Sequence, residues 1–194
     1  MSLRYALLAI LRVGPLSGYD LQKQFSQSVG HVWHAPDSQI YPELRKMEEA
    51  GLVEGEDQLR GERARRRVYH VTEAGDRAFI EWMQTPLEYQ RVRDPAHLRA
   101  AYLESVSYDA AREFFRGHIA EWEGELEQWR GELVHIENLS NPMLVRRLAV
   151  TADVDKPRTI AFKRITYEGL VEHALGEIAW ARRGLELVDE LEAG

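Results

Sequence analysis

An unbroken heptad pattern of apolar residues is the feature of this sequence that most restricts its fold. Large apolar side chains recur at alternating spacings of four and three, at Phe115, Ile119, Trp122, Leu126, Trp129, Leu133 and Ile136. Such a repeat predicts one long helix whose apolar stripe packs against another helix. We expect Ser107 to cap this helix and Asn141-Pro142 to end it.

A second long helix is predicted after Asp155-Lys156-Pro157, ending near Glu192. Its apolar stripe consists of Tyr167, Val171, Ala174, Ile178, Ala181, Leu185 and Val188, widened by Leu170 and Leu175. Two long helices joined by a turn predict an antiparallel helical hairpin. A shorter helix is expected over Pro95–Glu104.

The aromatic residues of the first stripe carry a large apolar area, which a second copy of the chain could cover. We therefore expect a homodimer built mainly from Tyr108–Ile136 and Arg158–Glu192. The candidate dimerisation residues are Phe115, Ile119, Trp122, Leu126, Trp129, Leu133, Leu170, Val171, Ile178 and Leu185. The alternative is that these residues form an ordinary core within one chain.

The first 86 residues read as three helices, a hairpin and a fourth helix. The first helix is predicted to end at Gly14-Pro15, and the second to run from Ser17 or Gly18 to Gly30. Asp37 or Ser38 is expected to cap the third helix, whose buried positions are Ile40, Leu44 and Met47.

Gly51 stands where a left-handed residue would end the third helix. Leu52-Val53 and Val68–Val71 then predict two strands, with the charged segment Glu54–Arg67 as a long hairpin tip, and Thr72 is expected to cap the fourth helix. This order is typical of a winged helix-turn-helix. The fold expected is thus mostly α with a small β-hairpin.

Two domains are expected, a DNA-binding winged helix-turn-helix over residues 1–86 and a helical dimerisation domain over residues 87–194. The boundary is placed at Thr85-Pro86, because the residue before a proline is disfavoured in a helix.

The third predicted helix has the composition of a DNA-recognition helix. Its first turn offers Ser38, Gln39 and Tyr41, whose hydrogen-bonding groups suit base edges or adjacent phosphates in a major groove. Arg45 and Lys46 lie opposite the buried face and are expected to contact the DNA backbone.

The predicted hairpin tip is rich in arginine, at Arg60, Arg63, Arg65, Arg66 and Arg67. Strand alternation places Arg65 and Arg67 on one side of the strand and Arg66 on the other. Arg63, Arg65 and Arg66 are the candidate wing contacts to DNA. The alternative is a solvated loop whose arginines pair with Glu54, Glu56 and Asp57.

Three motifs in this half, taken together, resemble the PadR family of bacterial transcriptional regulators. They are Ser17-Gly18-Tyr19-Asp20-Leu21, then Ser38–Leu44 followed by Met47–Leu52, and finally Arg67–Gly75. The later helices resemble, less specifically, those of the virulence activator of the same superfamily. The resemblance implies a homodimer, most often a repressor, that binds a pseudo-palindromic operator on double-stranded DNA. In some members phenolic or multidrug-type ligands release the DNA.

Composition and apolar runs restrict the kinds of site that the chain can carry and where the protein acts. The chain has no cysteine, which excludes disulfides and thiolate sites, and a formal net charge of −7, which confines any nucleic-acid site to a local basic patch. No stretch is long and apolar enough to span a membrane. Arg12 interrupts the apolar run Ala6–Leu11, so we expect a cytoplasmic protein rather than a secreted one.

The sequence contains no catalytic motif, so we expect no enzyme and no cofactor. A metal site at His31, His34 and Asp37 is disfavoured, because only three candidate ligands lie together in a loop. A protein-binding adaptor remains the alternative function, and salt-sensitive DNA affinity would discriminate against it.

An aromatic effector would find flat apolar surfaces in both halves of the chain. The candidates are Trp82, Tyr89, Tyr102, Phe114, Phe115, Trp122 and Phe162. An aromatic stripe at helical spacing is more often a packed core than a pocket, and no ligand can be named from it.

Overall fold

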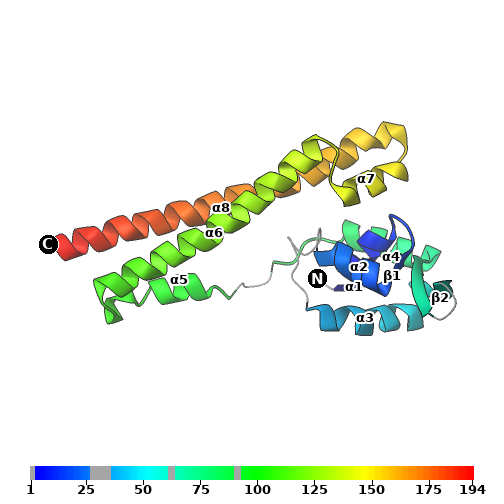
Figure 1. Ribbon diagram of the computed structural model, residues 1–194, viewed down its shortest axis with the longest axis horizontal. Coiled ribbons are helices and arrows are strands. Elements are labelled where there is room, and N and C mark those ends of the chain that lie inside the picture. The colour runs from blue at the N-terminus through cyan, green and yellow to red at the C-terminus, as the bar shows by residue number, and fades with distance from the viewer. Residues whose placement is uncertain (1–2, 27–35, 61–63, 90–92) are drawn as a thin grey trace. The chain divides into compact units, whose positions relative to one another are not determined.

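A computed structural model describes residues 3–26, 36–60, 64–89 and 93–194; it does not describe the side chains at positions 37, 59, 60, 64 and 65. The chain divides into two compact units, Met1–Glu88 and Tyr89–Gly194 (Figure 1). None of the helices in the described ranges combines the length and apolarity that a bilayer crossing needs.

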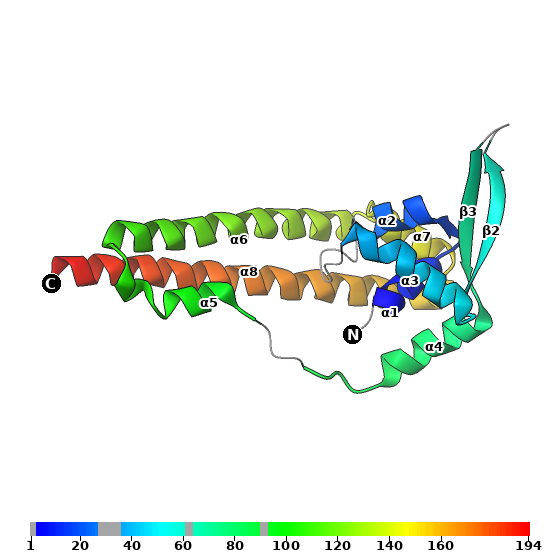
Figure 2. The ribbon, with the colours of Figure 1, turned by 90° about the horizontal axis from the view of Figure 1, so that it is seen from below.

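The N-terminal unit is a winged helix-turn-helix, as predicted. Its elements are α1 (Leu3–Leu11), β1 (Leu16–Ser17), α2 (Gly18–Ser26), α3 (Asp37–Glu49), β2 (Val53–Arg60), β3 (Ala64–Val71) and α4 (Glu73–Gln84). The strands form an antiparallel sheet in the order β1-β3-β2. Figure 2 shows β2 and β3 extending as a two-stranded ribbon beyond the helices α2 and α3.

The helices of this unit pack around a shared apolar core. Ile40, Leu44 and Met47 of α3 are fully buried, as their spacing predicts, and α1 contributes Leu7 and Ile10. Gly51 has φ of +69°, so the prediction of a left-handed residue after α3 is confirmed. The side chain of Thr72 accepts a hydrogen bond from the Gly75 N–H and caps α4, also as predicted.

Three local predictions in this unit were wrong. Pro36, rather than Asp37 or Ser38, occupies the N-cap position of α3, and no side-chain hydrogen bond caps that helix. Most of the predicted charged tip belongs to strands β2 and β3, because cross-strand pairing extends to Arg60 and Ala64. The strand β1 was missed, since two residues cannot show an alternating pattern. The predicted stop at Gly30 lies outside the described residues.

The C-terminal unit is a long helical hairpin. It comprises α5 (Pro95–Ala100), η2 (Leu103–Ser105), α6 (Tyr108–Glu137), α7 (Pro142–Ala149), η3 (Asp153–Asp155) and α8 (Lys156–Ala193). The helices α6 and α8 run side by side in opposite directions (Figures 1 and 2). Ser107 caps α6, as predicted.

Two details of this unit differ from the predictions. The helix expected over Pro95–Glu104 is divided into α5 and the short η2. The long helix α6 ends at Glu137, before the predicted stop at Asn141-Pro142, and Leu139 follows with φ of 53°. Asn141 instead starts α7, which was not predicted, and its side chain accepts from the Leu144 N–H at 2.8 Å.

The two heptad stripes meet within one chain. Their most buried members are Phe115, Leu126, Trp129, Ile136, Tyr167, Ala174, Ile178, Ala181 and Val188. The other members proposed for dimerisation pack partly buried against this core, at Ile119, Trp122, Leu133, Leu170, Val171 and Leu185. Packing of α6 against α8 therefore accounts for the stripes, as the intramolecular alternative states. The dimerisation residues stay a prediction, and the partly buried members among them still present surface to a second subunit.

Both ends of the hairpin are held by polar contacts. At the open end, Arg112 of α6 binds Asp189 at 2.8 Å and also Glu192, and the Tyr108 hydroxyl donates to the Leu191 carbonyl. At the α7 end, the amide of the buried Asn141 donates to Glu132 at 2.7 Å.

Candidate nucleic-acid interface

The helix α3 presents the predicted recognition residues on one surface. Ser38, Gln39, Tyr41, Arg45 and Lys46 are all exposed. The opposite face of the helix is anchored in the core by residues that are 0% exposed. The helix thus combines a fixed inner face with an outer face of hydrogen-bonding and cationic groups, which suits insertion into a major groove.

Tyr41 is positioned by a close approach between α2 and α3. A Cβ added to Gly18, the first residue of α2, would lie 2.6 Å from Cε1 of the Tyr41 ring. Glycine is therefore the residue that fits against this ring. Tyr41 itself is 40% exposed, and Tyr19, the residue after Gly18 in α2, is 69% exposed. Sequence reasoning did not select Tyr19, although its place in the Ser17–Leu21 motif could have indicated it.

The wing arginines have different surroundings. Arg66 of β3 donates from Nη2 to the Asp20 carboxylate of α2 at 2.6 Å. Arg67 binds Glu48 of α3 and, at 3.1 Å, Asp57 directly across the hairpin. The pairing of Arg67 with Asp57 follows the alternative of internally paired arginines. Arg63 lies outside the described residues, and so does the side chain of Arg65.

The two carboxylates near Arg67 affect its charge. Hydrogen bonds from Arg67 to Glu48 first, and to Asp57 second, hold the pKa of the guanidinium above its ordinary value. Arg67 is consequently a permanent cation that is already matched by two anions. It contributes little net positive charge to the surface of the wing.

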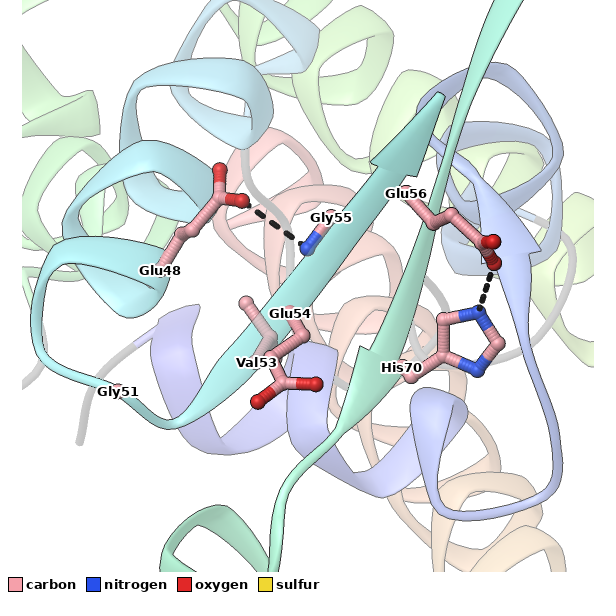
Figure 3. A pocket seen from close by; sticks show the side chains of 7 residues that line it. All are labelled: Glu48, Gly51, Val53, Glu54, Gly55, Glu56 and His70. Carbon is pink, nitrogen blue, oxygen red and sulfur yellow. Dashed lines mark hydrogen bonds and ion pairs between the residues drawn. The ribbon is translucent and has the colours of Figure 1, made fainter. Parts of the chain in front are cut away.

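The inner side of the wing carries an acidic groove of about 700 Å³. It is lined by Glu48, Gly51, Val53, Glu54, Gly55, Glu56 and His70 (Figure 3). Glu48 accepts a hydrogen bond from the Gly55 N–H at 3.0 Å, and His70 faces Glu56 at 3.7 Å. Although Glu48 is paired with Arg67, the carboxylates give this groove a negative charge, which disfavours a DNA phosphate there.

The aromatic candidates for an effector site are distributed over both units. Trp82 stacks on Tyr5 in the N-terminal unit, with ring centroids 4.7 Å apart. In the C-terminal unit, Phe114 and Phe115 pack edge to face. Tyr89, Tyr102 and Phe162 are exposed. No one cluster therefore contains all seven candidates.

Sequence reasoning missed the centre of the aromatic cluster in the C-terminal unit, which is Trp180 of α8. Phe115 and His118 pack edge to face with it, and His97 of α5 stacks on it at 4.1 Å. His118 also binds Glu177 at 3.0 Å, with both side chains largely buried. A heptad count on α8 did not reveal Trp180, because it lies beside the buried stripe.

Metal binding receives no support from the described part of the chain, where no three histidine, aspartate or glutamate residues come together as a metal site would require. His31 and His34 lie outside the described residues, as does the side chain of Asp37.

Comparison with known proteins agrees with this geometry. Residues 7–81 match the model of the Transcriptional regulator PadR-like family. The negative transcriptional regulator PadR of Bacillus subtilis is 29% identical over 143 residues, which cover 73% of this chain and 78% of the relative.

Solved structures extend the similarity to both units. The crystal structure of Bacillus subtilis PadR in complex with operator DNA aligns with a TM-score of 0.75 at 26% identity, over 96% of this chain and 98% of that one. The same regulator in complex with p-coumaric acid aligns with a TM-score of 0.70 at 25% identity, over 96% and 95%. The virulence activator AphA of Vibrio cholerae aligns with a TM-score of 0.60 at 26% identity, over 98% and 99%. Residues 7–81 thus carry a domain of the PadR-like family of transcriptional regulators, and both units share their fold with Bacillus subtilis PadR.

Proposed function

We propose that this regulator is a homodimeric repressor that binds a pseudo-palindromic operator through α3 and the wing. The observation that carries the proposal is the outer face of α3, where five exposed polar or cationic side chains stand opposite a fully buried face. Ser38, Gln39 and Tyr41 would contact base edges or nearby phosphates. Arg45, Lys46 and the wing arginines 63, 65 and 66 would contact the backbone.

The proposal of a repressor follows the function of a relative. Bacillus subtilis PadR is a negative regulator that has been crystallised with operator DNA. A dimer on an operator would repress by occupying DNA that polymerase needs. Since genomic DNA is the target, we propose that the chain acts in the cytoplasm.

Exposed apolar side chains of the C-terminal unit support the homodimer. Phe162, Ile165, Leu187 and Leu191 of α8 are all more than half exposed. A homodimer that binds a pseudo-palindromic operator needs two recognition helices on half-sites about 34 Å apart. Light scattering at micromolar concentration should give twice the mass of the chain, and a monomer would contradict the proposal.

We also propose an aromatic effector, because Bacillus subtilis PadR has been crystallised with p-coumaric acid and this chain carries the aromatic cluster around Trp180. Binding of a small aromatic compound is expected to quench tryptophan fluorescence and to weaken DNA affinity. DNA should weaken the affinity for the compound by the same factor, because the coupling between two binding sites is reciprocal. Quenching with unchanged DNA affinity would argue against a regulatory ligand.

Replacing Lys46 by alanine tests the backbone contact of α3. Loss of one phosphate contact should lower the slope of log K against log salt by about 0.9, and it should weaken binding to all sequences alike. The measurement is a titration of a selected duplex at several salt concentrations. Lys23→Ala, an exposed change on α2 outside the proposed contacts, is the matched control. An unchanged slope for Lys46→Ala would remove that residue from the interface.

Replacing Gly18 by alanine tests the role of Tyr41. The added methyl group would displace a flexible ring rather than backbone, so the unit should stay folded while Tyr41 loses its orientation. Operator affinity is expected to fall about tenfold, the effect of one good base contact, with little change for random DNA. Adding Gly18→Ala to Tyr41→Ala should then cost nothing further. A further loss in the double variant would show that Gly18 acts by another route.

A further inference from the structure

Asp20, in the first turn of α2, is held in a defined position. Its backbone N–H donates to the Ser17 hydroxyl oxygen at 3.1 Å, and that hydroxyl donates to Asp20 Oδ2 at 2.7 Å. The Ser17 side chain therefore caps α2 and fixes the Asp20 carboxylate at the same time. The same Oδ2 receives the Arg66 hydrogen bond from the wing.

Arg66 retains donors after it has bound Asp20. A guanidinium offers five N–H groups. Among the described residues, Nη2 is the only nitrogen of Arg66 with a carboxylate partner. Nε is buried without a hydrogen-bond partner in the described part of the chain, so the donors left for a ligand are the remaining N–H groups of Nη1 and Nη2. The Arg66 side chain is 40% exposed, so it is ordered by Asp20 without being enclosed.

Arg67, one residue along the strand, has a different environment. It is bound by two carboxylates, Glu48 and Asp57. It also packs over Gly55, where an added Cβ would collide with the Arg67 Nε atom and lie 2.7 Å from Glu48 Oε1. Glu48 is in turn held by the Gly55 N–H (Figure 3). Arg67 thus connects the wing to α3, and its charge is matched by two carboxylates, although its side chain is as exposed as that of Arg66.

We infer that Asp20 is a positioning residue of the DNA interface. It orients Arg66 so that the free N–H groups can bind a DNA phosphate, whereas Arg67 fastens the wing and does not contact DNA. An arginine that is already ordered loses less side-chain freedom when it binds. This inference rests on the proposed function and adds to it the residue that prepares one wing contact.

The direction in which DNA affinity changes when Asp20 is neutralised distinguishes a positioning role from a purely electrostatic one. If Asp20 only repelled DNA, its neutralisation would strengthen binding. If it orients Arg66, the variant Asp20→Asn should bind the operator about three- to tenfold more weakly, the cost of ordering one long side chain on binding. Glu49→Gln, an exposed change on α3, is the matched control for removing one negative charge and should not weaken binding.

The experiment is a double-mutant cycle of Asp20→Asn and Arg66→Ala on the full chain. The probes are a duplex selected from genomic fragments and a random-sequence duplex of the same length, each titrated at several salt concentrations. Arg66→Ala should lower the salt slope by about 0.9, because one phosphate contact is lost, whereas Asp20→Asn keeps that contact and should weaken binding without lowering the slope. The double variant should bind no more weakly than Arg66→Ala alone. Arg67→Ala should reduce thermal stability and leave the slope unchanged.

The outcomes separate the inference from the proposed function. Tighter or equal binding by Asp20→Asn would overturn the positioning role, and so would additive losses in the double variant. A folded wild-type chain without salt-dependent DNA binding would overturn the proposed function together with this inference. Circular dichroism of each variant establishes that the helices are intact.

Discussion

Replacing Gly75 by alanine should destabilise the N-terminal unit by about 3 kcal/mol, at the upper end of the usual cost of overpacking. Gly75 is buried in the first turn of α4. A Cβ there would collide with the Leu52 carbonyl oxygen and lie 3.0 Å from Val71 Cγ2. Backbone cannot rotate aside as a side chain can. The Leu52 backbone, between α3 and β2, would therefore have to move away from the first turn of α4.

The matched control is Gly117→Ala on the exposed side of α6, where an added Cβ meets nothing within 4 Å. Alanine is the better helix former, so this variant should gain up to about 1 kcal/mol. Thermal unfolding combined with hydrogen exchange would assign each change to its unit. Equal effects of the two substitutions would contradict the close approach of α4 to the Leu52 backbone.

Replacing Trp129 by alanine should destabilise the C-terminal unit by about 3–5 kcal/mol, the usual range for removing a buried tryptophan. Trp129 is 5% exposed, lies between α6 and α8 and packs edge to face with Trp122, with ring centroids 6.2 Å apart. Faster hydrogen exchange in α6 and α8, with the N-terminal unit unchanged, is the expected readout.

Two further variants locate the cause of this loss. Trp129→Phe should cost less, since it keeps most of the ring and removes a buried indole N–H that lacks a hydrogen-bond partner among the described residues. Val134→Ala, on the same helix but 52% exposed, should change stability by no more than about 0.5 kcal/mol. If Val134→Ala lost as much stability as Trp129→Ala, the packing that stabilises this unit would not be the contact between α6 and α8.

Periodic patterns were sufficient to predict most of the fold. The stripes from Phe115 to Ile136 and from Tyr167 to Val188 each identified a long helix, because one buried face must repeat at helical spacing. Elements too short to show a period were missed or divided, as with β1, α5 and α7. Their positions depend on pairing and capping with residues elsewhere in the chain.

The same distinction applies to the interface. The helical repeat alone was enough to predict which residues lie on the outer face of α3. They are Ser38, Gln39, Tyr41, Arg45 and Lys46. No local pattern could show that Asp20 binds Arg66, because 46 positions separate them and the contact depends on the β1–β3 register. Composition therefore identified an arginine-rich wing, while the difference between Arg66 and Arg67 required the tertiary structure.

Selection of bound fragments from genomic DNA, followed by titration of the best site at several salt concentrations, tests the central claim most directly. The account predicts one discrete site with two half-sites about 34 Å apart and an affinity that falls steeply with salt. Fragments no better enriched than random DNA, recovered with a folded dimer, would contradict the assignment of α3 and the wing as an operator-binding surface.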